Sequence, residues 1–446
     1  MRFQPSVSVL FGGWLCLSGA AAAEPGEHIR AGAAEITPAV SLEGAYRSNV
    51  YLQEGEIGGG VPVTPGALLS VRPTLGVKVD SDTLVFALDA GYNARKYLNP
   101  DLSNLDRFNF FDIGAGASIL PKGMFGLVLR NDLMLSGRET EATTAADAYI
   151  LALTERASGK LVFRPGSSME LGLGGALDIQ DYNTPGATNT FATTNLNSRF
   201  GYGGIADLQW RFFPRTALVA DAEWGRFTWQ DNILNAQGSG QSDDDLGDFI
   251  GIPDGRYWRA TAGLRGRFTE KLVLGVGVGY GVLIYDEQSV IDGAQLDGIS
   301  GPEVNPAVSN FGADLKGFPE GLLLRGDLAY EITPKQKFVL GYARDFQDVF
   351  WTNYVQYHRF TVAWKGTFAD RVTGTFDTMI RREAYGGEAT RDDNYLRSQV
   401  GLALHTTKWL DVTAGQSWQR RSSVGGANPS VEFDDFTTTL GLRATY

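Results

Sequence analysis

Apolar and polar residues alternate with a period of two over most of the chain from Ile36 onward. The pattern is clear in the last segment, 436–446, where every second residue is apolar or small and the residues between them are Thr, Gly or Arg. Such alternation is typical of a β-strand with one face in an apolar medium and the other in water. On this segment alone, a strand of a β-sandwich would show the same pattern.

Breaks of two lengths alternate between these segments. Short breaks such as 121–123 and 214–215 have the composition of tight turns, whereas the breaks near 230–255 and 287–319 are much longer. Outer-membrane barrels have this asymmetry, with short periplasmic turns and long external loops. The sequence therefore predicts an all-β fold, a transmembrane antiparallel β-barrel of about 18 strands over residues 36–446.

The N-terminus indicates export. Residues 1–23 have the plan of a secretory signal peptide, with Arg2 before an apolar core and a run of alanines at its end, and residues 24–35 follow as a short periplasmic leader. The lone Cys16 lies in the signal, so we expect no disulfide, no bound metal and no cofactor in the mature chain. These features predict the outer membrane of a Gram-negative bacterium as the location.

The chain also ends on an aromatic residue, as the insertion signals of bacterial outer-membrane barrels do. We expect Leu440, Leu442 and Tyr446 to form this signal and a barrel-assembly machinery to read it. Tryptophans fall toward segment ends, where the aromatic girdles of membrane barrels lie. They are Trp210, Trp224, Trp258, Trp364, Trp409 and Trp418.

Many basic residues fall on the inward positions of the alternation. On the lipid face each would cost roughly 2–4 kcal/mol near the bilayer midplane, so the sequence predicts that they line the lumen. The candidate substrate path is Arg72, Arg95, Arg130, Arg156, Lys160, Arg199, Arg211, Arg259, Arg265, Arg267, Arg325, Arg359, Arg381, Arg397 and Arg443, with Lys78, Lys365 and Arg421 on the same face. The inward acids are expected to be fewer, which favours an anion-attracting channel. Ion pairs that brace the wall are the alternative.

Other patterns speak against an enzyme. The chain has only three histidines, His28, His358 and His405, which do not converge at one level of the predicted wall, and no G-x-S-x-G motif. The alternating glycines of the 272–284 segment lie in a strand with no helix after it, so they predict no phosphate loop. They leave room on the inner wall for a folded-in loop. The acidic cluster at 243–248 is expected to be a solvated loop rather than a cation site.

The segment Ile36–Tyr51 resembles the opening of the β-barrel porins found with exopolysaccharide export systems. The sequences Pro214-Arg215-Thr216 and Tyr257-Trp258-Arg259 are similar to that family as well. The resemblance implies a passive conduit for a secreted polysaccharide that works with periplasmic and inner-membrane export proteins. Alginate export porins, with a basic lumen, offer an analogy.

The preferred interpretation at this stage is an outer-membrane conduit for a secreted, anionic exopolysaccharide. A general or anion-preferring diffusion porin for small solutes is the first alternative, and an adhesive or structural barrel is the second. Outer-membrane lipid and lipopolysaccharide are expected neighbours of any of the three, and nucleic acid is not an expected partner.

Overall fold

The computed structural model describes most of the predicted barrel. The described residues are 29–31, 33–50, 63–107, 109–138, 150–183, 196–230, 254–285, 321–348, 354–386, 391–424 and 432–445. The predicted signal peptide, the acidic cluster at 243–248 and Tyr446 lie outside these ranges. Among the described residues, no helix has the length and apolar character needed to span a membrane.

Long antiparallel strands make up nearly all of the described chain. They are β2 (Ala34–Arg47), β3 (Gly66–Asp80), β4 (Leu84–Tyr97), β5 (Phe110–Ile119), β6 (Phe125–Arg138), β7 (Ile150–Phe163), β8 (Met169–Asn183), β9 (Leu196–Phe213), β10 (Thr216–Gln230), β11 (Gly255–Arg267), β12 (Leu272–Tyr285), β13 (Gly321–Thr333), β14 (Gln336–Asp348), β15 (Tyr354–Phe368), β16 (Val372–Gly386), β17 (Arg391–His405), β18 (Leu410–Val424) and β19 (Phe433–Thr445). A three-residue strand, β1 (Ile29–Ala31), and a 3-10 helix, η2 (Pro100–Arg107), complete the elements.

Each strand pairs with the next one along the chain, and the last strand pairs with β2, so the sheet closes on itself. The closing register runs from Thr437 opposite Arg47 to Thr445 opposite Ala39. The prediction of a closed, antiparallel barrel of 18 strands is therefore confirmed. Strand β1 pairs with the start of β2, so part of the predicted leader is attached to the wall.

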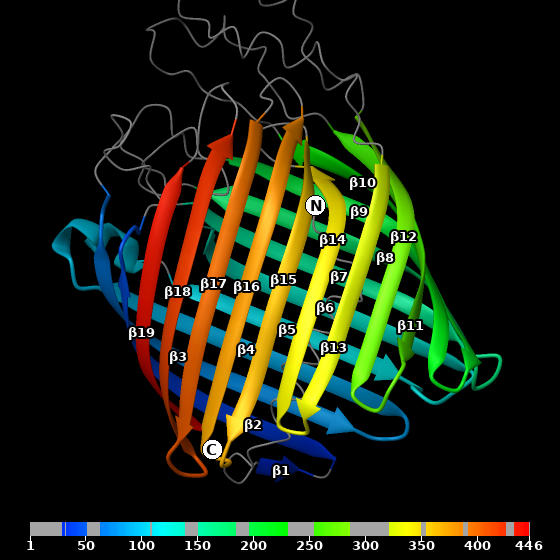
Figure 1. The fold of residues 1–446 in the computed structure, drawn as a ribbon, viewed down its shortest axis with the longest axis horizontal. Coiled ribbons are helices and arrows are strands. Elements are labelled where there is room, and N and C mark those ends of the chain that lie inside the picture. The colour runs from blue at the N-terminus through cyan, green and yellow to red at the C-terminus, as the bar shows by residue number, and fades with distance from the viewer. Residues whose placement is uncertain are drawn as a thin grey trace, which may run out of the picture.

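The two ends of the barrel differ (Figure 1). The tight turns gather at the end where the C-terminus lies, which we call the short-turn end. Leu120, Ala369 and Asp370 adopt positive φ there, as tight reversals require. The opposite end, the loop end, includes η2, where Leu102 and Leu105 pack on Val50, Leu68 and Tyr97. By the asymmetry of outer-membrane barrels, the short-turn end is periplasmic and the loop end is external.

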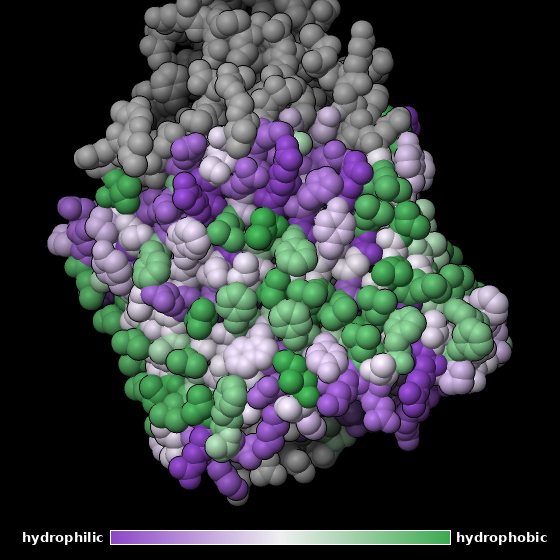
Figure 2. All heavy atoms as spheres, in the orientation of Figure 1, coloured by the Kyte–Doolittle hydropathy of each residue, from purple (hydrophilic) through white to green (hydrophobic). Residues whose placement is uncertain are grey.

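The outer face of the wall is apolar. Large side chains such as Leu173, Val276, Ile380, Leu402 and Leu440 stand exposed on it, because a membrane barrel presents this face to lipid. Five of the predicted girdle tryptophans also lie on it, namely Trp210, Trp224, Trp258, Trp364 and Trp418. Figure 2 shows apolar side chains spread over this face between more hydrophilic ends.

One polar pair interrupts the apolar face near the middle of the strands. Asn131 of β6 and Glu155 of β7 share the ladder face of Leu129, Leu133 and Leu161, and the Asn131 amide donates to the Glu155 carboxyl group over 3.0 Å. The hydrogen bond satisfies one oxygen of a group that lipid cannot solvate.

Candidate channel lumen

The ladder register places every basic residue that we predicted for the substrate path on the face opposite the exposed apolar side chains. These residues are Arg72, Arg95, Arg130, Arg156, Lys160, Arg199, Arg211, Arg259, Arg265, Arg267, Arg325, Arg359, Arg381, Arg397 and Arg443. Each strand turns its opposite face outward, so these side chains point to the interior of the barrel.

Acids are fewer than basic residues on the inward face of the described strands, as expected, but the difference is small. The inward face also carries Glu43, Asp89, Asp112, Asp132, Glu170, Asp178, Asp207, Asp221, Glu223, Asp327, Glu331, Asp345, Asp377, Glu383, Asp393, Asp411 and Asp435. Some of them, such as Asp393, belong to strands that run further toward the loop end than the hydropathy pattern indicated. Much of the lumen charge is therefore balanced within the wall.

Glycines on the inner face let some ion pairs skip a strand. Lys160 of β7 reaches across β8 to Asp207 of β9 over 2.6 Å, and Gly172 of β8 lies beneath that contact. Arg72 of β3 reaches Asp112 of β5 in the same way over 2.6 Å, above Gly91 of β4. A cation, a glycine and an aspartate on three successive strands thus form one bracing unit.

We expect Gly172→Ala to weaken the barrel. The new Cβ would lie 2.5 Å from an Asp207 oxygen and 2.6 Å from Lys160 Cδ, so the ion pair must move or break. Overpacking of this kind typically costs about 1–3 kcal/mol, which urea unfolding of the purified barrel would measure. Gly116→Ala on β5 is the matched control, because no atom lies within 4 Å of its new Cβ. Equal unfolding midpoints for the two variants would contradict the role of the glycine.

One buried ionic cluster joins β16, β17 and β18 toward the loop end. Arg421 Nε donates to Asp393 over 2.8 Å and its guanidinium donates to Glu383 over 2.5 Å, and these three side chains are at most 2 % exposed. Arg381 contacts Glu383 as well, and the Tyr385 hydroxyl donates to the same carboxylate. The cluster satisfies its charges internally, so it braces the wall rather than waiting for a solute.

A second cluster reaches across the interior. Arg199 of β9 donates to Asp178 of β8 over 2.7 Å and to Asp348, at the end of β14, also over 2.7 Å. Its guanidinium lies 4.7 Å from the centre of the Phe227 ring. Strands β9 and β14 are separated by four strands along the wall, so the Arg199–Asp348 contact ties two distant parts of the barrel together.

The end of β14 makes that contact possible because it bends into the lumen while it stays paired with the start of β15. Phe346, Gln347 and Asp348 are all buried, whereas a wall strand would bury only alternate residues. The Phe346 ring lies against the position of Gly281 and packs with Tyr257 and other apolar residues of β8 to β13. The folded-in segment expected against the glycine stripe is thus the 346–348 segment, which narrows the lumen toward the loop end.

The short-turn end of the lumen is different, because it carries cations outside any ion pair of the described residues, although Glu35 and Asp411 lie opposite Lys78 and Arg443 in the ladder. The side chains of Lys78, Arg211, Arg267, Lys365 and Arg443 lie at this end on β3, β9, β11, β15 and β19. None of the five makes an ion pair with another described residue, and all but Lys365 are exposed. Acids at this end include Glu170, which pairs with Arg164 over 2.8 Å, and Asp411, which pairs with His405.

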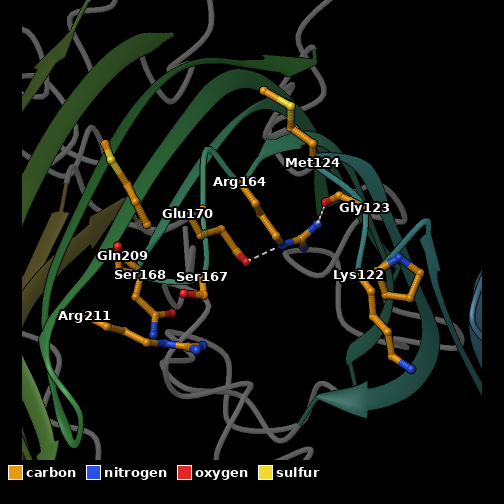
Figure 3. A pocket seen from close by; sticks show the side chains of 12 residues that line it. Lys122, Gly123, Met124, Arg164, Ser167, Ser168, Glu170, Gln209 and Arg211 are labelled. Carbon is orange, nitrogen blue, oxygen red and sulfur yellow. Dashed lines mark hydrogen bonds and ion pairs between the residues drawn. The ribbon is translucent and has the colours of Figure 1, made fainter.

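A pocket of about 560 Å³ opens beside one of these cations. Figure 3 shows Arg211 and Arg164 on the pocket wall, with Ser167 and Ser168 of the β7–β8 turn between them. The Arg164 guanidinium also donates to the Gly123 carbonyl over 3.3 Å. Glu170 also lines the pocket and pairs with Arg164, so the donors that the wall leaves outside an ion pair are the Arg211 guanidinium and the two serine hydroxyls.

His358 and His405 lie apart, as the sequence indicated, and His28 lies outside the described residues. His405 faces inward near the short-turn end and His358 lies on the outer face, where its Nδ1 is 2.9 Å from the Tyr342 hydroxyl. Within the described ranges, no group of three His, Cys, Asp or Glu side chains could hold a metal ion.

Comparison with protein families and with curated proteins gives no match. Among solved structures, the chain is similar to the outer-membrane protein OpdK of Pseudomonas aeruginosa, with 13 % identity, a TM-score of 0.43 and coverage of 92 % of this chain and 99 % of that one. OccAB3 of Acinetobacter baumannii gives 11 % identity, a TM-score of 0.42 and coverage of 92 % and 97 %. The FrpB iron transporter of Neisseria meningitidis gives 8 % identity and a TM-score of 0.44, with coverage of 92 % of this chain and 81 % of that one.

The membrane assignment follows from the chain's own geometry. The barrel is closed, its outer face is mainly apolar, and away from the loop end its ionic strand residues face inward, with the exception of Glu155. The chain is a transmembrane antiparallel β-barrel of 18 strands. Leu440 and Leu442 stand 66 % and 46 % exposed on its lipid face.

Proposed function

We propose that the barrel is a diffusion channel for small polar solutes with a preference for anions. The observation that carries the proposal is the set of exposed cations at the short-turn end, Lys78, Arg211, Arg267 and Arg443, whose charge no described acid pairs with. Unneutralised charge in a low-dielectric channel raises the local concentration of the opposite ion. The preference is local to this end, because the lumen toward the loop end is ion-paired.

The same geometry makes polysaccharide export the weaker of the two readings. The 346–348 segment and the two buried clusters occupy part of the lumen toward the loop end. A polymer conduit needs a passage that stays wide along its whole length, whereas a small solute passes a local narrowing. None of the comparisons links the chain to an exopolysaccharide system, so that role rests on the sequence resemblance alone.

Ion selectivity in planar bilayers tests the proposal. The purified barrel should pass chloride in preference to potassium, and the triple variant Arg211→Gln, Arg267→Gln and Arg443→Gln should lose most of that preference. The matched control removes three charges from the outer face, through Lys96→Gln, Arg256→Gln and Arg420→Gln, and should leave selectivity unchanged. Cation preference in the unaltered channel would refute the proposal.

Deletion of the chain in its host separates the two transport readings. We expect the surface polysaccharide to keep its amount and its sugar composition, while uptake of small anions across the outer membrane slows. Loss of surface polysaccharide while its synthesis machinery persists would support export in place of diffusion.

A further inference from the structure

Basic side chains on the outer face gather at the loop end. Within the described strands they are Lys96, Arg226, Arg256, Arg344, Arg382 and Arg420, each near the loop end of its strand. The short-turn half of the same face carries no Lys or Arg within those strands. Figure 2 shows the front of the barrel, where hydrophilic side chains gather toward the loop end above the apolar ones.

Three basic side chains lie in one row of this region. Arg344 of β14 is directly opposite His358 of β15, and His358 is directly opposite Arg382 of β16. The two guanidinium groups thus lie two strands apart in one row, and repulsion between them means that the fold gains nothing from this arrangement by itself. We call Arg344, His358 and Arg382 the basic row.

The described protein supplies little negative charge to the basic row. Arg382 lies 3.4 Å from Asp392, in a pair whose side chains are 70 % and 44 % exposed, and such an exposed pair contributes little. The Arg344 side chain makes no hydrogen bond or ion pair with any described residue. Its Nε is buried, but its two terminal nitrogens are not, so they can donate to an anion outside the barrel.

An apolar row lies directly beneath the basic row, one step nearer the middle of the membrane. Tyr342, Phe360 and Ile380 are directly opposite one another on β14, β15 and β16 and are 37 %, 42 % and 51 % exposed. Each precedes or follows a member of the basic row by two residues, so both rows share one face. The surface therefore presents donors at the level of headgroups and apolar contact at the level of acyl chains.

We infer that the outer face of β14, β15 and β16 binds a phosphorylated glycolipid of the outer leaflet. The basic row takes a phosphate group, with the two guanidinium groups as charge-assisted donors, and the apolar row takes the acyl chains. A basic surface next to the membrane interface is a setting in which anionic headgroups are recognised. The inference rests on the barrel and its orientation and is independent of what the lumen conducts.

Isolated basic residues at a membrane interface extend their charged ends to the headgroup region without selecting a particular lipid. Lys96 fits that description, because its cross-strand partner Leu69 is apolar. The basic row differs in that its members are adjacent in the ladder and lie above a matching apolar row.

Native mass spectrometry of the full-length barrel with bis-phosphorylated lipid A tests the site. At about fivefold per basic residue near a membrane surface, Arg344→Gln with Arg382→Gln should weaken binding about thirtyfold. Arg344→Lys with Arg382→Lys keeps the charges and should keep most of the affinity. The control pair Lys96→Gln and Arg420→Gln removes the same charge at the same level outside the basic row and should change affinity less than about twofold.

The unaltered barrel gives a test that does not depend on the folding of a variant. It should bind lipid A with both phosphates much more tightly than dephosphorylated lipid A with the same acyl chains. Equal affinity for the two lipids would overturn the inference, as would equal losses in the Gln pair and the control pair. Displacement of lipid A by inorganic phosphate alone would identify a free phosphate site in its place and would refute the lipid as ligand.

Discussion

Replacement of Arg421 by Met is expected to lower the free energy of unfolding of the barrel by about 3–5 kcal/mol, the usual cost of leaving buried charges without their partner. Glu383 and Asp393, which are 1 % and 0 % exposed, would face a neutral side chain of similar length. Glu383 would keep Arg381 and Tyr385, but the two buried carboxylates would then share one guanidinium in place of two, and water cannot reach them where they lie. Urea unfolding followed by tryptophan fluorescence in detergent micelles would measure the loss.

Arg397→Met is the matched control for this experiment. Arg397 also faces inward, on β17, but it is exposed and makes no ion pair with another described residue. Its replacement should change the free energy of unfolding by no more than about 0.5 kcal/mol, as for most exposed positions. Similar losses for both variants would show that the buried cluster has no special part in stability.

Phe346→Ala should give a channel with a larger single-channel conductance. Phe346 is 2 % exposed and holds the 346–348 segment against β8 to β13. Without the ring, the apolar contact that keeps the segment inside the lumen is lost, and water can fill the space. The variant should also be less stable by up to about 3–5 kcal/mol, the cost of removing a buried aromatic ring.

Phe360→Ala removes the same ring from the lipid face of the neighbouring strand β15, where Phe360 is 42 % exposed. Its conductance should match that of the unaltered channel. An unchanged conductance for Phe346→Ala, in channels that still insert, would mean that the segment does not limit the passage.

The facing of the strands was predictable because it depends on one local property. Period-two alternation decides which side chain meets lipid, and the cost of charge in lipid forces residues such as Arg130 and Arg325 inward. Closure was predictable for a related reason, since alternating loop lengths leave both termini at one end. These conclusions need no knowledge of which residues touch.

The ionic partners were not predictable, because they depend on the register between strands. Nothing near Lys160 in sequence indicates Asp207, and the glycine that lets them meet is on the strand between them. The basic row was missed for the same reason, although Arg344 and Arg382 are at outward positions of their own alternation. The inward turn of Phe346 breaks the alternation outright, so the pattern could not reveal it.

The contact between the last strand of the barrel, β19, and the residues at the end of β2 has a consequence for biogenesis. Asp435 of β19 accepts from Arg47 Nε over 2.9 Å and from the Asn49 backbone over 3.0 Å, so a residue near the end of the chain holds residues near its beginning. A chain that loses β19 would leave β2 and β18 with unpaired edges, which associate with other chains. Such a chain would form an aggregation-prone intermediate instead of a leaky pore. Proteases would then degrade incomplete copies before they could make the outer membrane permeable.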